Sequence, residues 1–481
     1  MKYINKNKLK NVIEPQLHHL LNDHNYEILE LDPKKLLSPN RLDIIYKILY
    51  LRGINKRSDY ATQCYLEHIR CFNFGKYSEF GNPKKNSAKN FLRVFKEIDK
   101  EIELAGFDSS KSIIPLASDG SILNGSHRIA SSIVRNKKVS CIKLSCDPCI
   151  YDYNFFVNRL VNKIWLEDII LNYLIESNHF SVALVWPRAN LKNKTLKKFF
   201  EKIIYFKEIK ININGLDQLI KLVYKDEDWI NKTKNNQGSM LKTTKCFKIN
   251  KPIKLIIFES RSTSYDLKVK SNIRDFCKVG NHSIHTTDNK SDAIRIAKIL
   301  LNENSINFIN NHCYKNKKEN INYLIDLERK IKNSNFLHED CIMSYKSSLN
   351  LYGLKKNHSK RNNKIYSLNK NKKNKKIKNF NIINISAKEK LPSEIFFNPN
   401  YFFWYRNLKF ISSKGILYLH KNGFIRLNKQ KKLDLININN TFNKSLLIKM
   451  KVLLFYFFNI LKFKAIQLKI LITIYLGKLK R

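Results

Sequence analysis

The stretch Ser118-Asp-Gly-Ser-Ile-Leu-Asn-Gly-Ser-His-Arg-Ile-Ala130 has the pattern of a strand end, a tight turn and the start of a helix. It follows the apolar run 113–116, contains the turn signal Asp119-Gly120, and leads into the apolar pair Ile129-Ala130. A loop that meets a helix N-terminus offers free backbone N–H groups and the positive end of the helix dipole to an anion. Arg128 adds a guanidinium that can hold phosphate through two hydrogen bonds. The stretch predicts a phosphate-binding loop, and the alternative is a plain turn whose His-Arg pair is solvated.

The second half of this stretch, Asn124-Gly-Ser-His-Arg-Ile-Ala130, resembles the D-G-x-H-R-x-A box of the ParB/sulfiredoxin fold. In that family the box holds nucleotide phosphates in partition proteins, sulfiredoxin and a free-serine kinase. The flanks are similar as well, with a strand expected before the box, a helix after it and a further strand at Lys138–Leu144. The chain departs from the family where Asn124 replaces the leading Asp, which removes a carboxylate that could orient the loop or a metal on the phosphates.

The resemblance implies a ParB/sulfiredoxin-like nucleotide-binding domain over 45–150, preceded by a helical N-terminal extension over 1–44. The ligand would be ATP or CTP, with or without Mg²⁺. His127 would be the catalytic acid–base group or a contact to the γ-phosphate, and we assign no metal ligand. The nucleotide-binding residues would be Asn124, Gly125, Ser126, His127 and Arg128.

The composition is strongly basic, since Lys and Arg number 89, Asp and Glu number 40, and the net charge is +49. Such a charge is typical of proteins that bind nucleic acid or an anionic membrane surface. Lys, Asn and Ile are abundant together, as expected of an AT-rich genome, and the lysines are spread along the chain. The basicity alone therefore does not identify a nucleic-acid partner. The length of 481 residues predicts about two to four domains.

The cysteines and the first residues of the chain indicate a reducing cytosol. Nine cysteines are scattered, which is not a disulfide framework, and residues 1–8 are polar, unlike a signal peptide. Cys141, Cys146 and Cys149 have a spacing with which an iron–sulfur or zinc site can begin, but no fourth ligand follows at a short fixed spacing. Because Cys141 falls in an expected strand, we interpret it as a small buried hydrophobe.

Hydrophobic periodicity predicts a mostly helical segment followed by an α/β segment. Residues 1–110 are expected to be mostly helical, with apolar faces over 42–51 and 88–104 and a helix end at Gly106. Between these helices, Glu79 is an exposed loop residue or, in a ParB-like fold, a group that faces the nucleotide. The next expected helices are 165–175, 194–204 and 215–224, and the expected strands are 180–187 and 252–259. Strands that alternate with helices predict a mainly parallel or mixed sheet.

A second place for an anion precedes the helix expected over 290–302. Asp288 or Asn289 would cap this helix, and its N-terminus could hold phosphate. His282 and His285, just upstream, are either a metal-binding or acid–base pair or two hydrogen-bonded loop histidines. We favour loop histidines, because no pair of carboxylates accompanies them in the sequence.

The segment Cys341-Ile-Met-Ser-Tyr-Lys-Ser-Ser-Leu-Asn-Leu-Tyr-Gly-Leu-Lys355 resembles the start of a minimal nucleotidyltransferase of the DNA polymerase β-like fold. In that family a Gly-Ser or Ser-Ser turn binds a nucleotide phosphate, and a later D-x-D pair holds magnesium ions. Ser347 and Ser348 match the turn and form a second candidate site. The D-x-D position falls near Ser359-Lys-Arg361, which has no carboxylate. The resemblance therefore implies a degenerate nucleotidyltransferase-like domain over 155–440, and the alternative is a helix pair in an ordinary α/β domain.

The last third of the chain gives weaker indications. Residues 396–405 and 408–413 resemble the later part of similar proteins, which tend to accompany bacterial surface-polysaccharide genes. We interpret their aromatic side chains as core rather than as a base-stacking platform. The Lys/Asn run 370–378 is interpreted as a solvated loop. The basic, apolar and helical tail 441–481 would lie on an anionic membrane surface or pack on the body of the protein.

Together these patterns predict an α/β (α+β) protein with a ParB/sulfiredoxin-like domain, a nucleotidyltransferase-like domain and a helical tail. The predicted function is nucleotide binding, with phosphotransfer or another nucleotide-dependent reaction in bacterial surface-polysaccharide biosynthesis. The alternative is a non-catalytic nucleotide- or nucleic-acid-binding protein. We expect a cytoplasmic protein that can also associate with the inner face of the membrane. Substrate, catalytic competence and oligomeric state are left open by the sequence.

Overall fold

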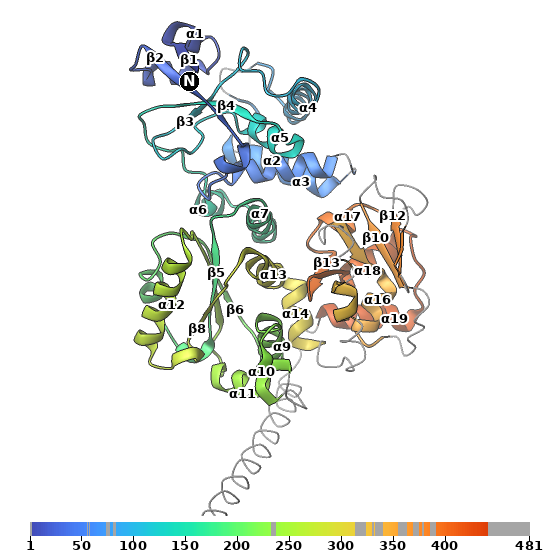
Figure 1. Cartoon of the computed structure of the whole chain (residues 1–481). Helices are drawn as coiled ribbons and strands as arrows, with labels where there is room; N and C mark the ends of the chain where they lie inside the picture. The colour runs from blue at the N-terminus through green and yellow to red at the C-terminus, as the bar shows by residue number, and fades with distance from the viewer. Residues whose placement is uncertain are drawn as a thin grey trace, which may run out of the picture.

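The computed structural model describes residues 2–440 apart from 55, 57, 74–76, 80–82, 232–236, 313–323, 330, 332–339, 355–362, 369–374, 378–379 and 385–390. Three separate sheets, each with its own helices, follow one another along the chain (Figure 1). We call the three parts the N-terminal unit (2–158), the middle unit (163–312) and the C-terminal unit (324–440). Helices and sheets are mixed throughout, so the expected α+β class is confirmed at this level.

The N-terminal unit contains a four-stranded sheet covered by helices. Across the sheet the strands are β1 (Lys2–Asn5), β2 (Asn25–Leu31), β4 (Val139–Lys143) and β3 (Ile114–Leu116). Only β3 and β4 are parallel neighbours. The helices are α1 (Lys6–Lys10), α2 (Asp43–Ile54), α3 (Asp59–Phe72), α4 (Ala88–Ala105), α5 (Ser126–Arg135) and α6 (Tyr153–Asn158). The helices predicted over 42–51 and 88–104 and the strand predicted at 138–144 are confirmed.

The first part of the chain corrects one expectation, because residues 1–44 are not a purely helical extension. β1 and β2 pair as antiparallel strands there, and β2 continues the pairing with β4 through Leu29 and Cys141. Residues 25–31 show only a weak alternation of buried and exposed side chains. The strand therefore depends on a partner far along the chain, which local periodicity does not reveal.

The middle unit is built on a four-stranded sheet with the strand order β6-β7-β5-β8. Its strands are β5 (Ser181–Val185), β6 (Ile203–Ile209), β7 (Ile253–Phe258) and β8 (Ile284–Thr286). All neighbours are antiparallel, so the prediction of a mainly parallel or mixed sheet is wrong. The strands β5 and β6 run in the same direction, but they are not neighbours, because the antiparallel strand β7 lies between them. This topology is a split β-α-β arrangement, with a helical insertion between β6 and β7.

The helices of the middle unit cover both faces of this sheet. They are α7 (Lys163–Glu176), α8 (Asn193–Lys197), α9 (Ile213–Val223), α10 (Asp228–Asn231), α11 (Gln237–Cys246), α12 (Thr263–Cys277), α13 (Lys290–Leu300) and α14 (Glu303–Asn311). Alternate residues of β5 point to opposite faces. Val182 and Leu184 join the large core that includes α9 and α13, whereas Ala183 and Val185 pack with α12. The expected helix 194–204 is shorter than predicted, because β6 begins at Ile203.

The C-terminal unit has a six-stranded mixed sheet in the order β11-β12-β10-β9-β14-β13. Its strands are β9 (Cys341–Met343), β10 (Asn363–Ser367), β11 (Lys375–Ile377), β12 (Phe380–Asn384), β13 (Phe402–Tyr405) and β14 (Leu408–Ile411). Its helices are α16 (Tyr345–Leu351), α17 (Glu394–Phe397), α18 (Ser413–Lys421) and α19 (Lys429–Asn440). Every residue of β13 is buried, which confirms that the aromatic run 402–405 is core. Across the described part of the chain, no helix combines the length and apolar character needed to span a membrane.

Helix α3 and the residue before it join the three units through hydrogen bonds between polar groups that are buried or half-buried. The Tyr60 hydroxyl donates to Asp168 of α7 at 3.0 Å. Glu394 of α17 accepts hydrogen bonds from the Ser58 hydroxyl and from the Tyr60 backbone N–H, both at 3.1 Å. Burial raises the pKa of Asp168 to about 7, although its bond from Tyr60 opposes the rise. A carboxyl group that changes its charge near neutral pH therefore lies at this junction.

We expect Asp168→Asn to remove one component of the pH dependence of stability. An unfolded Asp has a pKa of about 4, so between about pH 4 and 7 the folded state holds more protons on this group and the Asp168 contribution to stability falls as pH rises. The unfolding free energy of the wild type relative to that of the variant should therefore fall by roughly 2–4 kcal/mol over this range, since the other titrating groups contribute equally to both proteins. Urea unfolding at pH 5 and pH 7.5 measures this. Asp23→Asn, at an exposed position, is the control and should behave like the wild type.

Candidate anion-binding site at the start of helix α5

The loop that leads to α5 begins with a tight turn directly after β3. Ala117 N donates to Ser121 O at 2.8 Å, and Gly120 N donates to Ala117 O at 2.9 Å. The carboxylate of Asp119 accepts from the backbone N and the hydroxyl of Ser121, at 2.9 and 2.6 Å. Gly120 has a φ of +80°, as the predicted Asp-Gly turn requires. The turn sends the chain back along β3, where Ile122 forms an isolated bridge, and on to the helix start.

Gly125 is the N-cap of α5 and takes a left-handed conformation with a φ of +87°. A Cβ atom at this position would lie 2.5 Å from Cδ1 of Ile114. Both the backbone angle and the close approach to β3 therefore require glycine. The side-chain oxygen of Asn124 accepts a hydrogen bond from Gly125 N at 2.6 Å. Asn124 thus keeps an oxygen acceptor toward the loop backbone without the charge of the family's Asp.

The structure brings the predicted box residues together at the helix start. Helix α5 begins at Ser126, so Ser126, His127 and Arg128 form its first turn. The first backbone N–H groups of a helix have no carbonyl partner within the helix. No side chain caps this helix start. The local geometry therefore suits an anion.

His127 is held against the helical core instead of pointing freely into solvent. Its Nε2 shares a hydrogen bond with the Tyr65 hydroxyl at 2.9 Å, and its ring meets Phe95 edge-on with centroids 4.6 Å apart. Desolvation and then the charge of Lys47 lower the pKa of His127 well below its usual value. The imidazole is therefore neutral at neutral pH, so it can act as a hydrogen-bonding group or a base but not as a cation.

Arg128 already has an anionic partner, which is Glu14 from the segment before the short helix at Pro15–Leu20. Nη2 of Arg128 lies 2.5 Å from Oε1 of Glu14, and both side chains are about a quarter exposed (23% and 24%). The other oxygen, Oε2, is buried and has no hydrogen-bond partner among the described residues. A carboxylate of the chain itself therefore lies where the sequence predicts a phosphate. Nothing in the local sequence singles out Glu14.

A buried ionic network connects the loop to helix α2. Arg41 forms two hydrogen bonds to the carboxylate of Asp43, at 2.9 and 3.0 Å, and Arg41 also donates to the backbone oxygen of Ile122. Lys47 Nζ lies 3.1 Å from Asp43 Oδ2 and 3.1 Å from His68 Nε2. All four side chains of the network are buried. The loop before the box is thus tied to α2.

This network places a net positive charge near His127, in the first turn of α5. Burial alone would raise the pKa of Asp43, but the charges of Arg41 and Lys47 hold it well below its usual value. Burial lowers the pKa of Lys47 to about 8 and that of His68 well below its usual range. At neutral pH Arg41 and Lys47 thus share one carboxylate, and His68 is neutral. Asp43 and Lys47 are spaced i, i+4 inside an apolar run, a pattern that could have revealed the buried pair.

Glu79, a second sequence candidate near this site, is paired with a lysine. Its carboxylate lies 2.7 Å from Nζ of Lys85, and its backbone N donates to Lys85 O at 2.9 Å. Lys85 is also close enough to His127 for its charge to lower the pKa of that histidine. Glu79 therefore balances a cation beside the box.

The second candidate site differs from its sequence expectation in local structure. Ser347 and Ser348 lie inside α16, not in a turn before a helix, and both are buried. The Ser347 hydroxyl is 3.3 Å from that of Ser344, and the Ser348 hydroxyl has no hydrogen-bond partner among the described residues. The expected D-x-D position at 359–361 lies outside the described residues, as do most of the run 370–378 and the whole tail 441–481.

The cysteine spacing noted in the sequence does not form a recognisable metal cluster in the part of the chain that the structure describes. Cys141 is a buried residue of β4, as predicted, while Cys146 and Cys149 are half-buried in the following loop. Over the described residues, no group of three or more His, Cys, Asp or Glu side chains is arranged to hold a metal ion.

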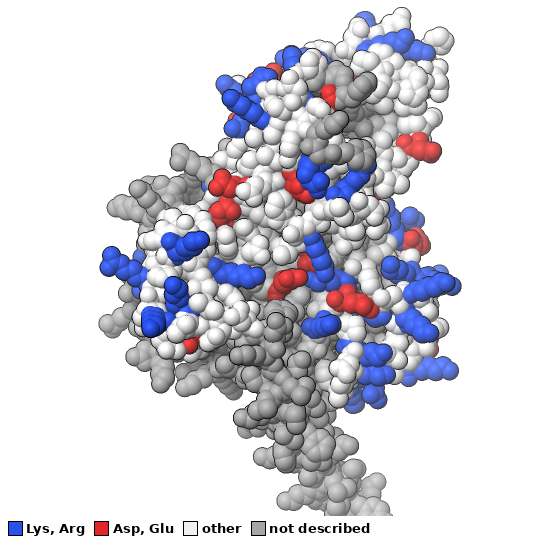
Figure 2. All heavy atoms as spheres, turned by 180° about the vertical axis from the view of Figure 1, so that it is seen from behind, with Lys and Arg blue, Asp and Glu red and all other residues white. Residues whose placement is uncertain are grey.

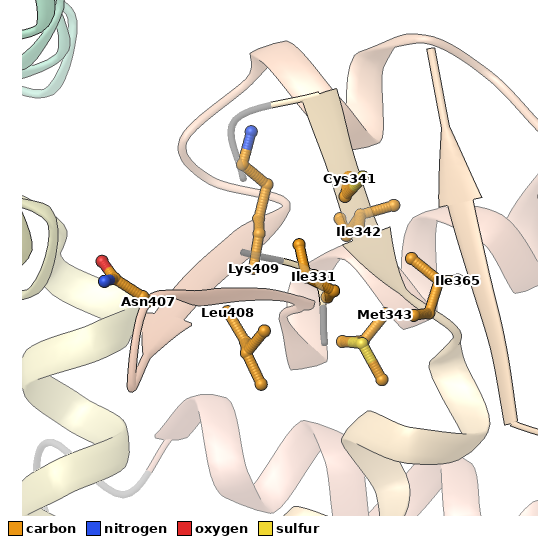
Figure 3. A pocket seen from close by; sticks show the side chains of 8 residues that line it. All are labelled: Ile331, Cys341, Ile342, Met343, Ile365, Asn407, Leu408 and Lys409. Atoms are coloured by element: carbon orange, nitrogen blue, oxygen red, sulfur yellow. The ribbon is translucent and has the colours of Figure 1, made fainter. Parts of the chain in front are cut away.

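A cavity in the C-terminal unit is too small for a metabolite (Figure 3). Its volume is about 10 Å³, the space of one water molecule at most. Its lining is mostly apolar and consists of Ile331, Cys341, Ile342, Met343, Ile365, Asn407, Leu408 and Lys409. We therefore interpret it as a packing gap between β9, β10 and β14.

Comparison of the chain with family models, curated proteins and solved structures found no match. The functional argument therefore rests on the residues of this chain.

We expect Gly125→Ala to destabilise the protein more than Gly120→Ala. Both residues have positive φ, but only a Cβ at position 125 meets other atoms within 4 Å, and the nearest of them is Ile114 Cδ1. The strained backbone alone costs about 1 kcal/mol, and the clash should bring the cost at position 125 to about 2–4 kcal/mol. Equilibrium urea unfolding of the two variants measures the difference. Equal losses would show that the loop can move away from β3.

We expect Asp43→Asn to be strongly destabilising, because it leaves Arg41 and Lys47 buried without a counter-charge. The expected loss is about 3–5 kcal/mol of unfolding free energy. Glu97→Gln breaks the exposed pair with Arg93 on α4 and should cost less than about 1 kcal/mol. Chemical denaturation of both variants checks the contrast, and a small loss for Asp43→Asn would contradict the network's role.

Proposed function

We propose that the N-terminal unit is a ParB/sulfiredoxin-like nucleotide-binding domain, in which the start of α5 binds phosphates of ATP or CTP. The observation that carries this proposal is the pair between Arg128 and Glu14, a carboxylate held by a guanidinium at an uncapped helix start. A phosphate oxygen can take the place of that carboxylate oxygen and gain a bidentate contact to Arg128. The glycine N-cap and the charge of Lys47 support the same assignment.

The activity we propose is phosphotransfer or another nucleotide-dependent reaction in bacterial surface-polysaccharide biosynthesis. Its biological setting rests on the sequence resemblance alone. In this proposal Asn124, Gly125 and Ser126 form the loop around the phosphates, and Arg128 holds them. His127, neutral and oriented by Tyr65, would contact the terminal phosphate or act as a base.

A non-catalytic nucleotide-binding protein is the second candidate, and the position of His127 favours it. A histidine whose Nε2 is bonded to Tyr65 and whose ring packs on Phe95 has less freedom to exchange protons with a substrate. Nucleic-acid binding has less support, because Lys and Arg side chains are dispersed over the face shown in Figure 2, with acidic side chains among them. Turnover of radiolabelled ATP or CTP by the purified protein separates the enzyme from the binding protein.

We expect Glu14→Gln to bind nucleotide more tightly than the wild type, and Arg128→Gln more weakly. The first change removes a carboxylate that competes for Arg128, and the second removes the phosphate contact. Each effect should be about tenfold or more in Kd, since a charge-assisted hydrogen bond is worth about 1.5–3 kcal/mol. Isothermal titration calorimetry with ATP and with CTP, with and without Mg²⁺, measures both.

Arg135→Gln is the matched control, because Arg135 forms its ion pair with Asp99 at the other end of the same helix. It should leave the nucleotide Kd unchanged. Absence of binding in both the wild type and Glu14→Gln would refute the proposed function. Unchanged affinity in Arg128→Gln would show that nucleotide binds elsewhere.

A further inference from the structure

The charges of four basic side chains act on His285 at the edge of the middle sheet. Three of them, Lys242 of α11 and Lys270 and Arg274 of α12, belong to helices that contact β8 or the short helix before it. We call these three residues and His285 of β8 the sheet-edge cluster. β8 is the last strand of the sheet and pairs only with β5. Both α11 and α12 contact the short helix at Gly280–His282 that leads into β8. Segments distant in the sequence therefore meet at this edge.

Tyr224, at the end of α9, links α11 to β8 within the cluster. Its ring centroid lies 5.0 Å from that of His285, and Nζ of Lys242 lies 5.4 Å from the Tyr224 ring. Lys242 also donates a hydrogen bond to Asn281 O at 2.6 Å. These contacts hold the ammonium group of Lys242 near the imidazole.

The positive charges of this region lower the pKa values of neighbouring side chains. Burial, followed by the charges of Lys270, Lys242, Arg295 and Arg274, lowers the pKa of His285 to about 3. Burial and the charges of Arg274 and Lys270 also contribute to a lowered pKa of Lys242. Four cations therefore lie within electrostatic reach of one buried, neutral imidazole.

Nearby carboxylates compensate these charges only in part. Asp292 pairs with Arg295 at 2.7 Å. Asp288 and Glu227 are near enough to act on the pKa of Lys270. Within the described part of the chain, no ion pair joins a carboxylate to Lys242, Lys270 or Arg274.

Arg274 carries a buried nitrogen atom, Nε, that has no hydrogen-bond partner among the described residues. Arg295, whose side chain is only 3% exposed, also has two such nitrogens, Nε and Nη1, but Asp292, Asp226 and Glu328 raise its pKa against the effect of burial. An unpaired guanidinium N–H in a buried setting costs free energy that a bound anion would recover.

The start of α13, where the sequence suggests a phosphate, is occupied by the chain itself. Asn289 caps the helix by accepting from Asp292 N at 3.0 Å, and the carboxylate of Asp292 lies in the first turn. The unpartnered Nε of Arg274 lies in the sheet-edge cluster instead. His285 is a member of that cluster, and over the described residues it belongs to no group of three or more potential metal ligands.

We propose that the sheet-edge cluster binds a phosphate group, either free phosphate or the phosphomonoester of a small molecule. A dianion with several acceptor oxygens suits one guanidinium and two ammonium groups better than a single carboxylate does. The neutral imidazole of His285 adds a hydrogen-bonding group without charge. This site is separate from α5 and does not depend on the proposed function of the N-terminal unit.

The test is calorimetric titration of the full chain with inorganic phosphate and, separately, with a hexose 6-phosphate, at constant ionic strength. We expect the wild type to bind at least one of the two, and the comparison shows which source of phosphate the site prefers. Arg274→Gln should weaken binding by about tenfold or more, since it removes a charge-assisted contact. Lys268→Gln is the matched control, at an exposed position on the same helix, and should bind like the wild type.

Two further variants keep the result decisive. Lys270 is half-buried and forms no ion pair among the described residues. The Lys270→Gln variant should therefore fold normally and bind phosphate more weakly. Arg135→Gln, in the N-terminal unit, should leave phosphate binding intact. No heat with the wild type, unchanged affinity in Lys270→Gln, or loss of binding in Arg135→Gln would overturn the proposal. Phosphate binding here without nucleotide binding at α5 would refute the proposed function and leave this site standing.

Discussion

The buried bond between Arg41 and Asp43 fixes the loop on which the candidate site depends. Arg41 uses one side of its guanidinium for the carboxylate and reaches the backbone oxygen of Ile122 with another nitrogen. A buried charge is tolerated only when its bonding capacity is met. The charged members Arg41, Asp43 and Lys47 are hydrogen-bonded to one another, and Arg41 joins α2 to the turn before α5. The shape of the loop is therefore set by the core as much as by its own residues.

The pair of Arg128 and Glu14 gives the site a particular chemical character. The guanidinium of Arg128, in the first turn of a helix without a side-chain cap, is already bound to a carboxylate of the chain, that of Glu14. One oxygen of Glu14 is buried without a partner among the described residues, so this carboxylate is incompletely bonded. A ligand with more acceptor oxygens can use the same guanidinium more fully. In our proposal, a phosphate therefore replaces this internal carboxylate.

Helix α3 connects this site to the other two units. Tyr65 on α3 orients His127, Tyr60 on the same helix bonds Asp168, and its N-cap Ser58 bonds Glu394. These contacts lie on one helix and its N-cap, so α3 touches both other units as well as the box. The pKa of Asp168, about 7, makes this junction sensitive to protonation near neutral pH.

The sequence by itself determined the features that depend on a few neighbouring residues, including the Asp-Gly turn, the glycine at position 125 and the helix end at Gly106. Such features follow from backbone angles and capping, which are local. The tertiary structure decided the pairing of β2, the antiparallel middle sheet and the partner of Arg128. It also placed Ser347 and Ser348 inside a helix. These features depend on which distant segments pack together. That packing is set by burial over the whole chain, so the periodicity of a short stretch of sequence does not predict it.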